Sequence, residues 1–500
     1  MATWSDIPFD ILDKVLAHLV SAGETSDRDH NEKLKDVVNA SAVCKTWREH
    51  TVNAKRVWAA LAGAHKVSPS TYGSILARSG NYPLLISTEV TAKLGTSSLT
   101  GYHWDAIRAN FHRVRLFDVE FEGEPDQSWL VTLSQPAPSL QGLRLKGNAY
   151  SNIEIPSLFA NSAPSLRVIH IENLELLNDK VPALSNVAGV HYFLPRIDDD
   201  DLKHEDCIGL LRNTPSVEFV SIGNFRFPSG DFDDDEQCYQ PFEAVPPIPL
   251  HRAKHVRIAG DLLGATAALI RLDLPLSCRY RFEFTVDECP RDGHVTNAGH
   301  ETFTRLDRIW AGKIYSGLRL TLCRAFVRLD MCGADGVFGD SLKMEMTRWD
   351  PSQGDYFEPF GLSDFAGFLA YISRQRHFQK MAGEVKELDL VFQINSEDFP
   401  DIPYEYLQEF FAVFPQVVHV KASGGTVLFL TDHERMMKTN IPNVYQPPFP
   451  ALQRLNIVNV HPQWVPEVKR HLQSLLELRQ QVIPNCPPLH VYCTERADFH

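Results

Sequence analysis

The stretch IPFDILDKVLAHLVSAGETSDRDHNEKLKDVVNASAVCKTWREHTVNAKRVW, residues 7–58, sets the organisation of this 500-residue chain. Pro8 suits the first turn of a helix, because its missing N–H would have no intrahelical partner there. The apolar residues after it have the three-and-four spacing of one helix face: Phe9, Ile11, Leu12, Val15, Leu16 and Leu19. A polar loop, 20–33, leads to a second apolar run: Val37, Val38, Ala40, Ala42 and Val43. We therefore predict two or three short amphipathic helices.

A module of about 50 residues lies near the lower limit for independent folding. It needs either a partner or the rest of the chain to complete its core. Spacing alone leaves two interpretations open: a docking module, or an N-terminal cap on a larger helical domain.

The order of residue types resembles an F-box, the helical module that docks on the Skp adaptor of a ubiquitin ligase. The matching residues are Ile7-Pro8, Asp10, Ile11-Leu12, Val15-Leu16, Leu19, Asp36-Val37-Val38, Val43-Cys44-Lys45-Thr46-Trp47-Arg48 and Trp58. The chain departs from the F-box pattern in having Ile7 where Leu is usual and in its longer polar loop, which costs only ~0.6 kcal/mol per doubling of length.

The resemblance implies that one set of residues either contacts the Skp adaptor or closes the core of the module. This set is Pro8, Ile11, Leu12, Val15, Leu16, Leu19, Val38, Val43 and Trp47. It also implies that Trp58 anchors the module to the next part of the chain, and that cullin is reached through the adaptor. The sequence does not divide the set into contact and core residues.

From Phe111 onward a weak repeat of the form apolar-x-x-apolar-x-apolar emerges, often after Pro-Ser. Its copies are Phe111, Val114, Leu116; Leu140, Leu143, Leu145; Leu166, Ile169, Ile171; Val217, Val220, Ile222; Ala253, Val256, Ile258; Val385, Leu388, Leu390; Val417, Val420, Ala422; Leu452, Leu455, Ile457; and a final variant, Leu489 with Tyr492. The first anchors are 29 and 26 positions apart, at the upper edge of the ~20–29 residues of a leucine-rich repeat.

Alternation within each copy predicts a short strand whose apolar side chains face inward. Helical segments are predicted between the strands, over 128–135, 202–212, 261–272, 364–373, 404–414 and 466–479. The predicted fold class is α+β multidomain: a small all-α F-box module (1–60), a helical linker or capping layer (61–105), and an α/β leucine-rich-repeat-like solenoid (106–500) with an irregular insertion at about 274–384. The alternative is a compact α/β domain.

Repeat units of this kind stack into a solenoid, because one unit cannot bury its apolar face alone. A target protein would then meet the exposed strand face. The positions that we expect there are Arg144, Lys146, His170, Glu172, Ser221, Arg257, Asp389 and Asn456. Their mixed charges define no class of target.

The sequence lacks the common catalytic motifs: a phosphate-binding Gly-x-x-x-x-Gly-Lys-Ser/Thr loop, Gly-x-Gly-x-x-Gly, Gly-x-Ser-x-Gly and His-Glu-x-x-His. The acidic segments 198–201 and 231–236 lack the glycine turn and distal glutamate of an EF-hand, which favours solvated loops over a calcium site. The nine cysteines include no Cys-x-x-Cys pair. We expect no catalytic residues, no metal and no cofactor.

The formal net charge of −14 argues against general affinity for nucleic acid or anionic membrane, which attract basic surfaces. No apolar run of 18 residues occurs, and Trp4, Ser5 and Asp6 stand where a secretory signal would be basic and then apolar. We expect a cytoplasmic or nuclear protein.

The resemblance and the repeat together predict a substrate-recognition subunit of an SCF-type cullin ubiquitin ligase, which performs no bond-making itself. The alternative is a non-degradative interaction scaffold in which the F-box-like helices only cap the repeats. A hydrolase with an unrecognised motif is a third interpretation, which would require a polar pocket with perturbed titratable groups.

Overall fold

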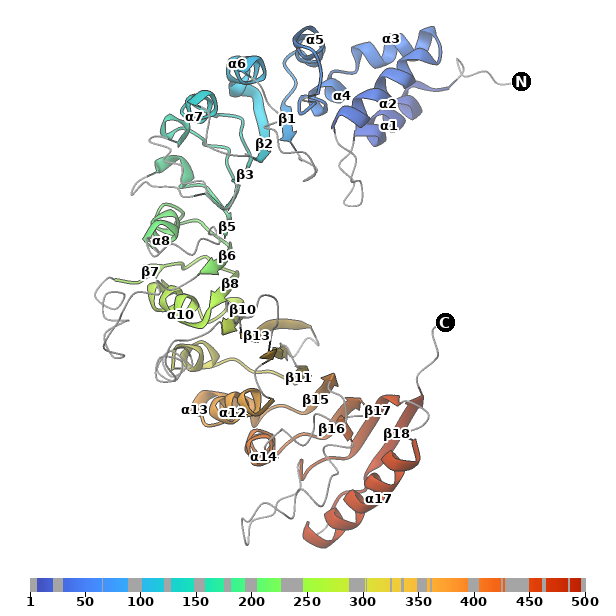
Figure 1. The fold of residues 1–500 in the computed structure, drawn as a ribbon, viewed down its shortest axis with the longest axis vertical. Helices are drawn as coiled ribbons and strands as arrows, with labels where there is room; N and C mark the ends of the chain where they lie inside the picture. Colours follow the sequence, from blue (N-terminus) through green and yellow to red (C-terminus); the bar gives the residue numbers. More distant parts are fainter. Residues whose placement is uncertain are drawn as a thin grey trace. The chain divides into compact units, whose positions relative to one another are not determined.

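The computed structural model describes residues 7–20, 30–64, 66–88, 101–120, 127–147, 158–174, 181–193, 205–225, 246–286, 302, 304–323, 326–333, 337–348, 358–359, 362–393, 404–423, 426–427, 449–460, 465–483 and 486–495. The chain divides into two compact units. The first comprises residues 1–230 and 248–253, and the second comprises residues 231–247 and 254–500. Figure 1 shows the elements of both.

The first unit begins with helices, as the periodicity of residues 7–58 predicts. They are α1 (Phe9–Val20), α2 (His30–Ala42), α3 (Lys45–Asn53), α4 (Lys55–Ala60) and α5 (Pro69–Ser79). Four of them lie within 9–60, where two or three were expected, and α2 begins at His30, inside the stretch predicted as a polar loop. Cys44 separates α2 from α3 because its backbone is extended, at φ −159° and ψ 176°. The N-terminus of α5 is capped: the Ser68 side chain accepts a hydrogen bond from the Thr71 N–H, and Pro69 follows at the first helical position.

Strands of the first unit pair in chain order, and every described pair is parallel. They are β1 (Leu84–Thr88), β2 (Val114–Glu120), β3 (Gly142–Lys146), β4 (Val168–Glu172), β5 (Gly189–Phe193) and β6 (Phe219–Phe225). The connecting elements are α6 (Gly101–Ala109), η2 (Phe111–Arg113), α7 (Gln127–Leu133), η3 (Leu158–Asn161), η4 (Pro182–Leu184) and α8 (Glu205–Arg212), followed by β7 (Ile248–Pro249). The helices α6, α7 and α8 lie on one side of these strands (Figure 1).

The buried face of this sheet matches the predicted alternation in β3, β4 and β6. Leu143, Leu145, Ile169 and Ile171 are all at most 2% exposed. Strand β2 differs. Its register against β1 shifts at Leu84/Leu85, which lie opposite Val114 and Leu116, and the residues it buries are Val114, Phe117 and Val119. The prediction that Leu116 faces inward was therefore wrong.

The second unit orders its strands as β8-β10-β13-β12-β11-β15-β16-β17-β18, with β14 beside β13. Their bounds are β8 (His255–Asp261), β9 (Leu272–Asp273), β10 (Arg279–Val286), β11 (Gly317–Cys323), β12 (Phe326–Cys332), β13 (Phe338–Arg348), β14 (Glu358–Pro359), β15 (Glu387–Gln393), β16 (His419–Ser423), β17 (Arg454–Val460) and β18 (His490–Glu495). The helices are α10 (Leu262–Arg271), α12 (Leu362–Ser373), α13 (Arg376–Ala382), α14 (Tyr404–Ala412) and α17 (Val465–Val482).

The stretch 274–384, expected as an irregular insertion, contributes strands to this sheet. Strand β12 pairs antiparallel with both β11 and β13, whereas β10 pairs parallel with β13 and β11 parallel with β15. Strand, helix, strand order is therefore interrupted here. Val327, Leu329 and Met331 of β12 are buried, so the antiparallel strands share the core of their parallel neighbours.

The end of the chain departs from the predicted last repeat. Strand β18 pairs parallel with β17, but its Tyr492 is 55% exposed and does not face the core. Instead, α17 brings a buried arginine under the start of β17. Arg479 donates hydrogen bonds to the carbonyls of Phe449 (2.8 Å) and Leu452 (3.0 Å). The Phe449 carbonyl also accepts from the Leu452 N–H at 3.0 Å, so the guanidinium matters most for the buried Leu452 carbonyl.

The described helices lie close to the predicted segments: α7, α8, α10, α12, α14 and α17 fall on 128–135, 202–212, 261–272, 364–373, 404–414 and 466–479. The chain thus combines helices with a large, mostly parallel sheet, compatible with an α+β class.

Candidate functional site

Helix α1 has two faces that the sequence did not separate. Leu12 and Leu16 are 1% and 0% exposed and belong to a closed apolar core. This core also contains Leu34, Val37, Ala40, Trp47, Val57, Trp58, Leu61, Ala64 and Ile75. Ile11 and Val15 lie one position before Leu12 and Leu16, and their side chains are 43% and 38% exposed. The module therefore completes its core without using all of its apolar residues.

Five further apolar residues of the module are exposed, and we call this set the apolar ridge: Phe9, Ile11, Val15, Val38 and Val43, each between 38% and 60% exposed. Ile11 and Val15 are one helical turn apart on α1, and neighbouring side chains at this spacing share a face. Val38 lies on α2, and Val43 lies immediately after it. Large exposed apolar side chains grouped on one module mark an interaction surface more often than singly scattered ones do.

Two side-chain contacts, a ring stack and a hydrogen bond, hold α1 against α3. The Phe9 ring stacks on His50, with centroids 5.2 Å apart, and a nitrogen of the His50 ring lies 2.6 Å from a carboxylate oxygen of Asp13. Both contacts join α1 to the last turn of α3. They fix the orientation of the exposed Ile11 and Val15 relative to the rest of the module.

Trp58 connects helix α4 to helix α5. Its ring is 3% exposed, its indole N–H donates to the Thr51 carbonyl at 2.8 Å, and Arg78 of α5 lies over the ring at 4.6 Å. Ile75 of α5 belongs to the same core. Helices α1 to α4 and α5 therefore share one hydrophobic core.

The predicted set of adaptor or core residues is divided by the structure. Leu12, Leu16 and Trp47 are core, and Leu19 is partly buried against that core. Pro8, Ile11, Val15, Val38 and Val43 are exposed. Sequence reasoning left two exposed apolar residues out of the set, Phe9 and Val52. Their apolar character was the available signal, but apolar type alone does not predict exposure.

On the predicted target face of the first unit, charged side chains of neighbouring strands form a series of ion pairs, which we call the charge ladder. Lys146 lies 3.2 Å from Glu120 and 3.8 Å from Glu172, on either side of it. Arg144 lies 3.5 Å from Asp118, and its strand neighbour is His170. Ser221, at the end of the same row, is 7% exposed, which makes it a poor contact for a target.

His170 is a partly buried titratable group of this charge ladder, with 26% of its side chain exposed. It stacks on His191 and Phe193, with centroids 5.6 and 5.8 Å away. Burial, together with Arg144 and His191, lowers the pKa of His170, against an opposing effect of Glu172. The imidazole is therefore held neutral over more of the pH range than an ordinary histidine.

A second row on this face carries large apolar residues separated by glycines: Leu116, Gly142, Val168, Gly189 and Phe219, paired in that order. Leu116, Val168 and Phe219 are each more than a third exposed. A Cβ on Gly142 would lie 2.9 Å from the Leu116 side chain. The glycines thus leave room for the apolar side chains to lie across the sheet.

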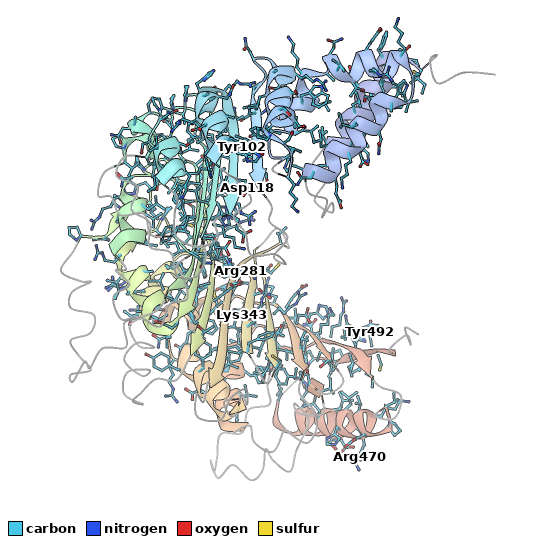
Figure 2. All side chains as sticks on the ribbon, turned by 45° about the horizontal axis from the view of Figure 1, so that its top comes forward. Tyr102, Asp118, Arg281, Lys343, Arg470 and Tyr492 are labelled. Atoms are coloured by element: carbon cyan, nitrogen blue, oxygen red, sulfur yellow. The ribbon has the colours of Figure 1, made fainter. Side chains whose placement is uncertain are left out.

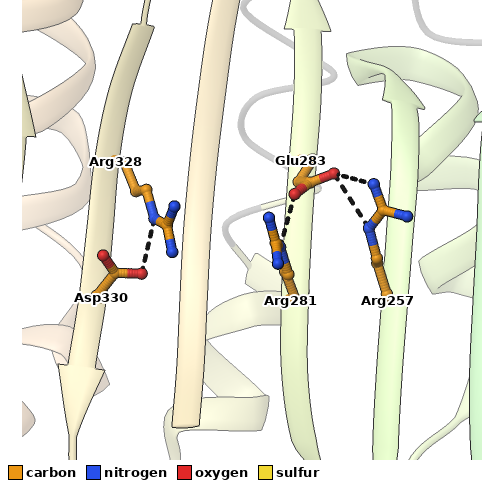
Figure 3. Close-up of polar contacts among 5 residues, drawn as sticks. All are labelled: Arg257, Arg281, Glu283, Arg328 and Asp330. Atoms are coloured by element: carbon orange, nitrogen blue, oxygen red, sulfur yellow. Dashed lines mark hydrogen bonds and ion pairs between the residues drawn. The ribbon is translucent and has the colours of Figure 1, made fainter. Parts of the chain in front are cut away.

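In the second unit the predicted face residues also lie on one row. The row runs Arg257, Arg281, Ser341, Asp330, Arg319, Asp389, Lys421, Asn456 and Tyr492. Arg257 donates from Nε (3.1 Å) and Nη2 (2.5 Å) to one oxygen of Glu283, and Arg281 donates to the other at 2.6 Å (Figure 3). Asp389 joins Arg319 at 2.8 Å and Lys421 at 3.5 Å. Asn456 contacts His419 at 3.0 Å.

A separate cluster of perturbed titratable groups lies inside the second unit. Lys313 donates to Asp340 at 2.9 Å and to the Cys278 carbonyl at 2.6 Å, and lies over the Tyr280 ring. Tyr315 donates to Asp340 and lies 3.3 Å from the Tyr280 hydroxyl.

Burial lowers the pKa of Lys313, although Asp340 acts in the opposite direction and raises it. Burial also raises the pKa of the Cys278 thiol to about 11. The other Asp340 oxygen accepts from the Tyr280 N–H at 2.9 Å. Because its groups satisfy one another, the cluster has the character of an internal support for β10 and β13 and not of a catalytic centre.

Among the described residues, no group of three or more His, Cys, Asp or Glu is placed to hold a metal ion. The acidic segments 198–201 and 231–236 lie outside those residues. Within the same part of the chain, no helix has the length and apolar character needed to cross a membrane.

No protein-family model matches the chain, and no curated protein matches it.

Proposed function

We propose that this chain is the substrate-recognition subunit of an SCF-type cullin ubiquitin ligase. Its F-box-like helices would dock on the Skp adaptor, and its strand faces would hold a target protein. The observation that carries the proposal is the apolar ridge: the module already has a closed core, yet Ile11, Val15, Val38 and Val43 stay exposed. A cap on the repeats would have no need of these exposed apolar side chains.

A second part of the proposal concerns the repeat architecture. We interpret the parallel strands with helices on one side as divergent leucine-rich repeats, in which stacking buries a core that one unit cannot. The support is the buried copies of the sequence repeat, such as Leu166, Ile169 and Ile171 in the first unit and Val385, Leu388 and Leu390 in the second.

In this role the chain would form and break no covalent bond itself and would need no cofactor. It would raise the effective concentration of the target near the ubiquitin-charged enzyme, which cullin brings to the same assembly. The expected location is the cytosol or the nucleus, where that machinery operates.

Co-purification with the Skp adaptor tests the proposal. The full chain is compared with Val15→Asp/Val38→Asp, which places a carboxylate on each of two ridge positions. The matched control is Lys14→Gln/Asn39→Asp, which changes the net charge equally at the neighbouring exposed positions of α1 and α2. We expect the ridge variant to lose the adaptor and the control to retain it.

Adaptor retained by the ridge variant would show that the docking surface is wrong. Adaptor absent from the unmodified chain would favour a non-degradative scaffold.

A further inference from the structure

The exposed face of the second unit presents basic side chains on five adjacent strands. We call these residues the basic strip: Arg257 on β8, Arg281 on β10, Lys343 on β13, Arg328 on β12 and Arg319 on β11. Strand register places Arg257 beside Arg281 and Lys343 beside Arg328. Like charges directly opposite each other in a sheet are destabilising, so this arrangement calls for a compensating interaction.

Part of the compensation comes from carboxylates that lie lower in the face than the guanidinium groups. Glu283 accepts from Arg257 and Arg281, and Asp330 accepts from Arg328 at 2.8 Å (Figure 3). Asp389 pairs with Arg319 at 2.8 Å. The three carboxylate side chains are 10–17% exposed, whereas the four arginine side chains are 36–51% exposed. A ligand approaching this face therefore meets positive charge first.

The buried carboxylates hold the cations in place without hiding them. Each guanidinium has five N–H donors in a planar fork, and Arg281 uses its Nε donor for Glu283. The Arg281 side chain is 51% exposed. Figure 2 shows Arg281 and Lys343 on neighbouring strands. Preordered cations lose less conformational entropy on binding a partner than mobile ones.

We propose that the basic strip binds an extended acidic segment of a partner protein, with carboxylates at about every third residue. This names the class of target segment and so rests on the proposed function for its role in the cell. Charge complementarity is the basis: the strip is cationic in a chain whose net charge is −14. A nucleic acid is disfavoured, because its dense phosphates would meet the overall negative charge and the interspersed Glu283 and Asp330.

The spacing of the ligand charges follows from sheet geometry. Adjacent strands lie about 4.8 Å apart, so alternate strands are about 9.6 Å apart. Three residues of polyproline II chain advance about 9.3 Å and return to the same side. A peptide lying across the strands would thus present carboxylates at i and i+6 to Arg257 and Arg319, which share one register row, and a carboxylate at i+3 near Lys343, whose Cα lies two residues, about 6.6 Å, along β13 from that row. The strip spans about 19 Å.

The test measures binding of labelled peptides to the full chain by fluorescence anisotropy at low salt. The probe is four repeats of Asp-Pro-Ala. The comparison peptide has the same composition with its four aspartates consecutive. We expect the spaced peptide to bind at least about threefold more tightly, and its affinity to fall steeply as salt rises.

The strip variant is Arg281→Gln/Arg319→Gln. It was chosen because Glu283 keeps Arg257 and Asp389 keeps Lys421 as partners. We expect about a tenfold loss of affinity from two exposed charge contacts. The control, Arg374→Gln/Arg470→Gln, removes the same charge from two side chains of the same unit that lie outside the strands and are more exposed, at 61% and 74%. It should bind as the unmodified chain does.

Three results would overturn the inference: no binding of either acidic peptide, equal loss in the strip and control variants, or tighter binding of a thymine 12-mer than of the spaced peptide. Equal affinity for the two acidic peptides would overturn the proposed spacing. The strip variant should still co-purify with the Skp adaptor, and the Val15→Asp/Val38→Asp variant should still bind peptide. Failure of this inference is therefore distinguishable from failure of the proposed function.

Discussion

Ile11 and Leu12 are consecutive residues of α1, and their side chains lie on opposite sides of a boundary: Ile11 is 43% exposed and Leu12 is 1% exposed. Substitution should therefore separate binding from stability. Leu12→Ala removes core volume and should destabilise the module by about 2–5 kcal/mol. Ile11→Ala should change stability by less than about 0.5 kcal/mol and weaken adaptor binding.

Hydrogen exchange over residues 7–64 measures the first effect, and adaptor pull-down measures the second. Equal protection in the two variants would show that the division between core and ridge is misplaced.

Gly63, in the turn after α4, lies against the backbone of β1. A Cβ at this position would lie 2.3 Å from the Ser87 carbonyl oxygen, a backbone atom that cannot move aside easily. Gly63→Ala should therefore destabilise the first unit by about 1–3 kcal/mol. Gly142→Ala is the matched comparison, because its Cβ would meet the end of the exposed Leu116 side chain at 2.9 Å. The smaller cost is expected for Gly142, as measured by urea unfolding.

Glu283 should make the second unit sensitive to acid. Burial raises the pKa of this carboxyl, but Arg257 and Arg281 outweigh it and hold the pKa below its ordinary value. A carboxyl with a lowered folded-state pKa stabilises the fold above its unfolded pKa, about 4.3, and loses that contribution as pH falls through the lower folded value. Glu283→Gln should reduce the acid dependence below about pH 4.3, measured as the urea midpoint against pH. An unchanged slope would contradict this assignment.

Arg479 should be needed for the ordering of β17. It is 1% exposed and donates to the Phe449 and Leu452 carbonyls. Arg479→Leu keeps an apolar stem but takes the guanidinium from the Leu452 carbonyl, at about 1–3 kcal/mol for a buried group that loses its partner, whereas the Phe449 carbonyl keeps the Leu452 N–H as a donor. We expect faster hydrogen exchange in residues 454–460. Arg470→Leu, at an exposed position of the same helix, should leave exchange in β17 unchanged.

The sequence was sufficient to predict the buried strand residues wherever local alternation was regular, as in Leu143 and Leu145. It failed at Leu116, because the register shift beside β1 depends on a neighbouring strand and not on local pattern. It also missed the antiparallel pairing of β12, since alternation is the same in either strand direction.

The candidate surfaces were less predictable for similar reasons. Periodicity grouped Ile11 with Leu12 because both lie near one apolar stripe, and only packing separates them. The basic strip joins residues up to 86 positions apart, from Arg257 to Lys343, so that no local window contains it.

Arg257 and Glu283 are 26 positions apart in sequence but become neighbours through strand register. Register depends on the strands themselves, so the length of the connecting segment does not decide which outward side chains meet. Evolution could therefore exchange single outward residues, or lengthen connections, while the interior stays intact. The chemistry of the outward face would then diverge faster than the architecture that supports it.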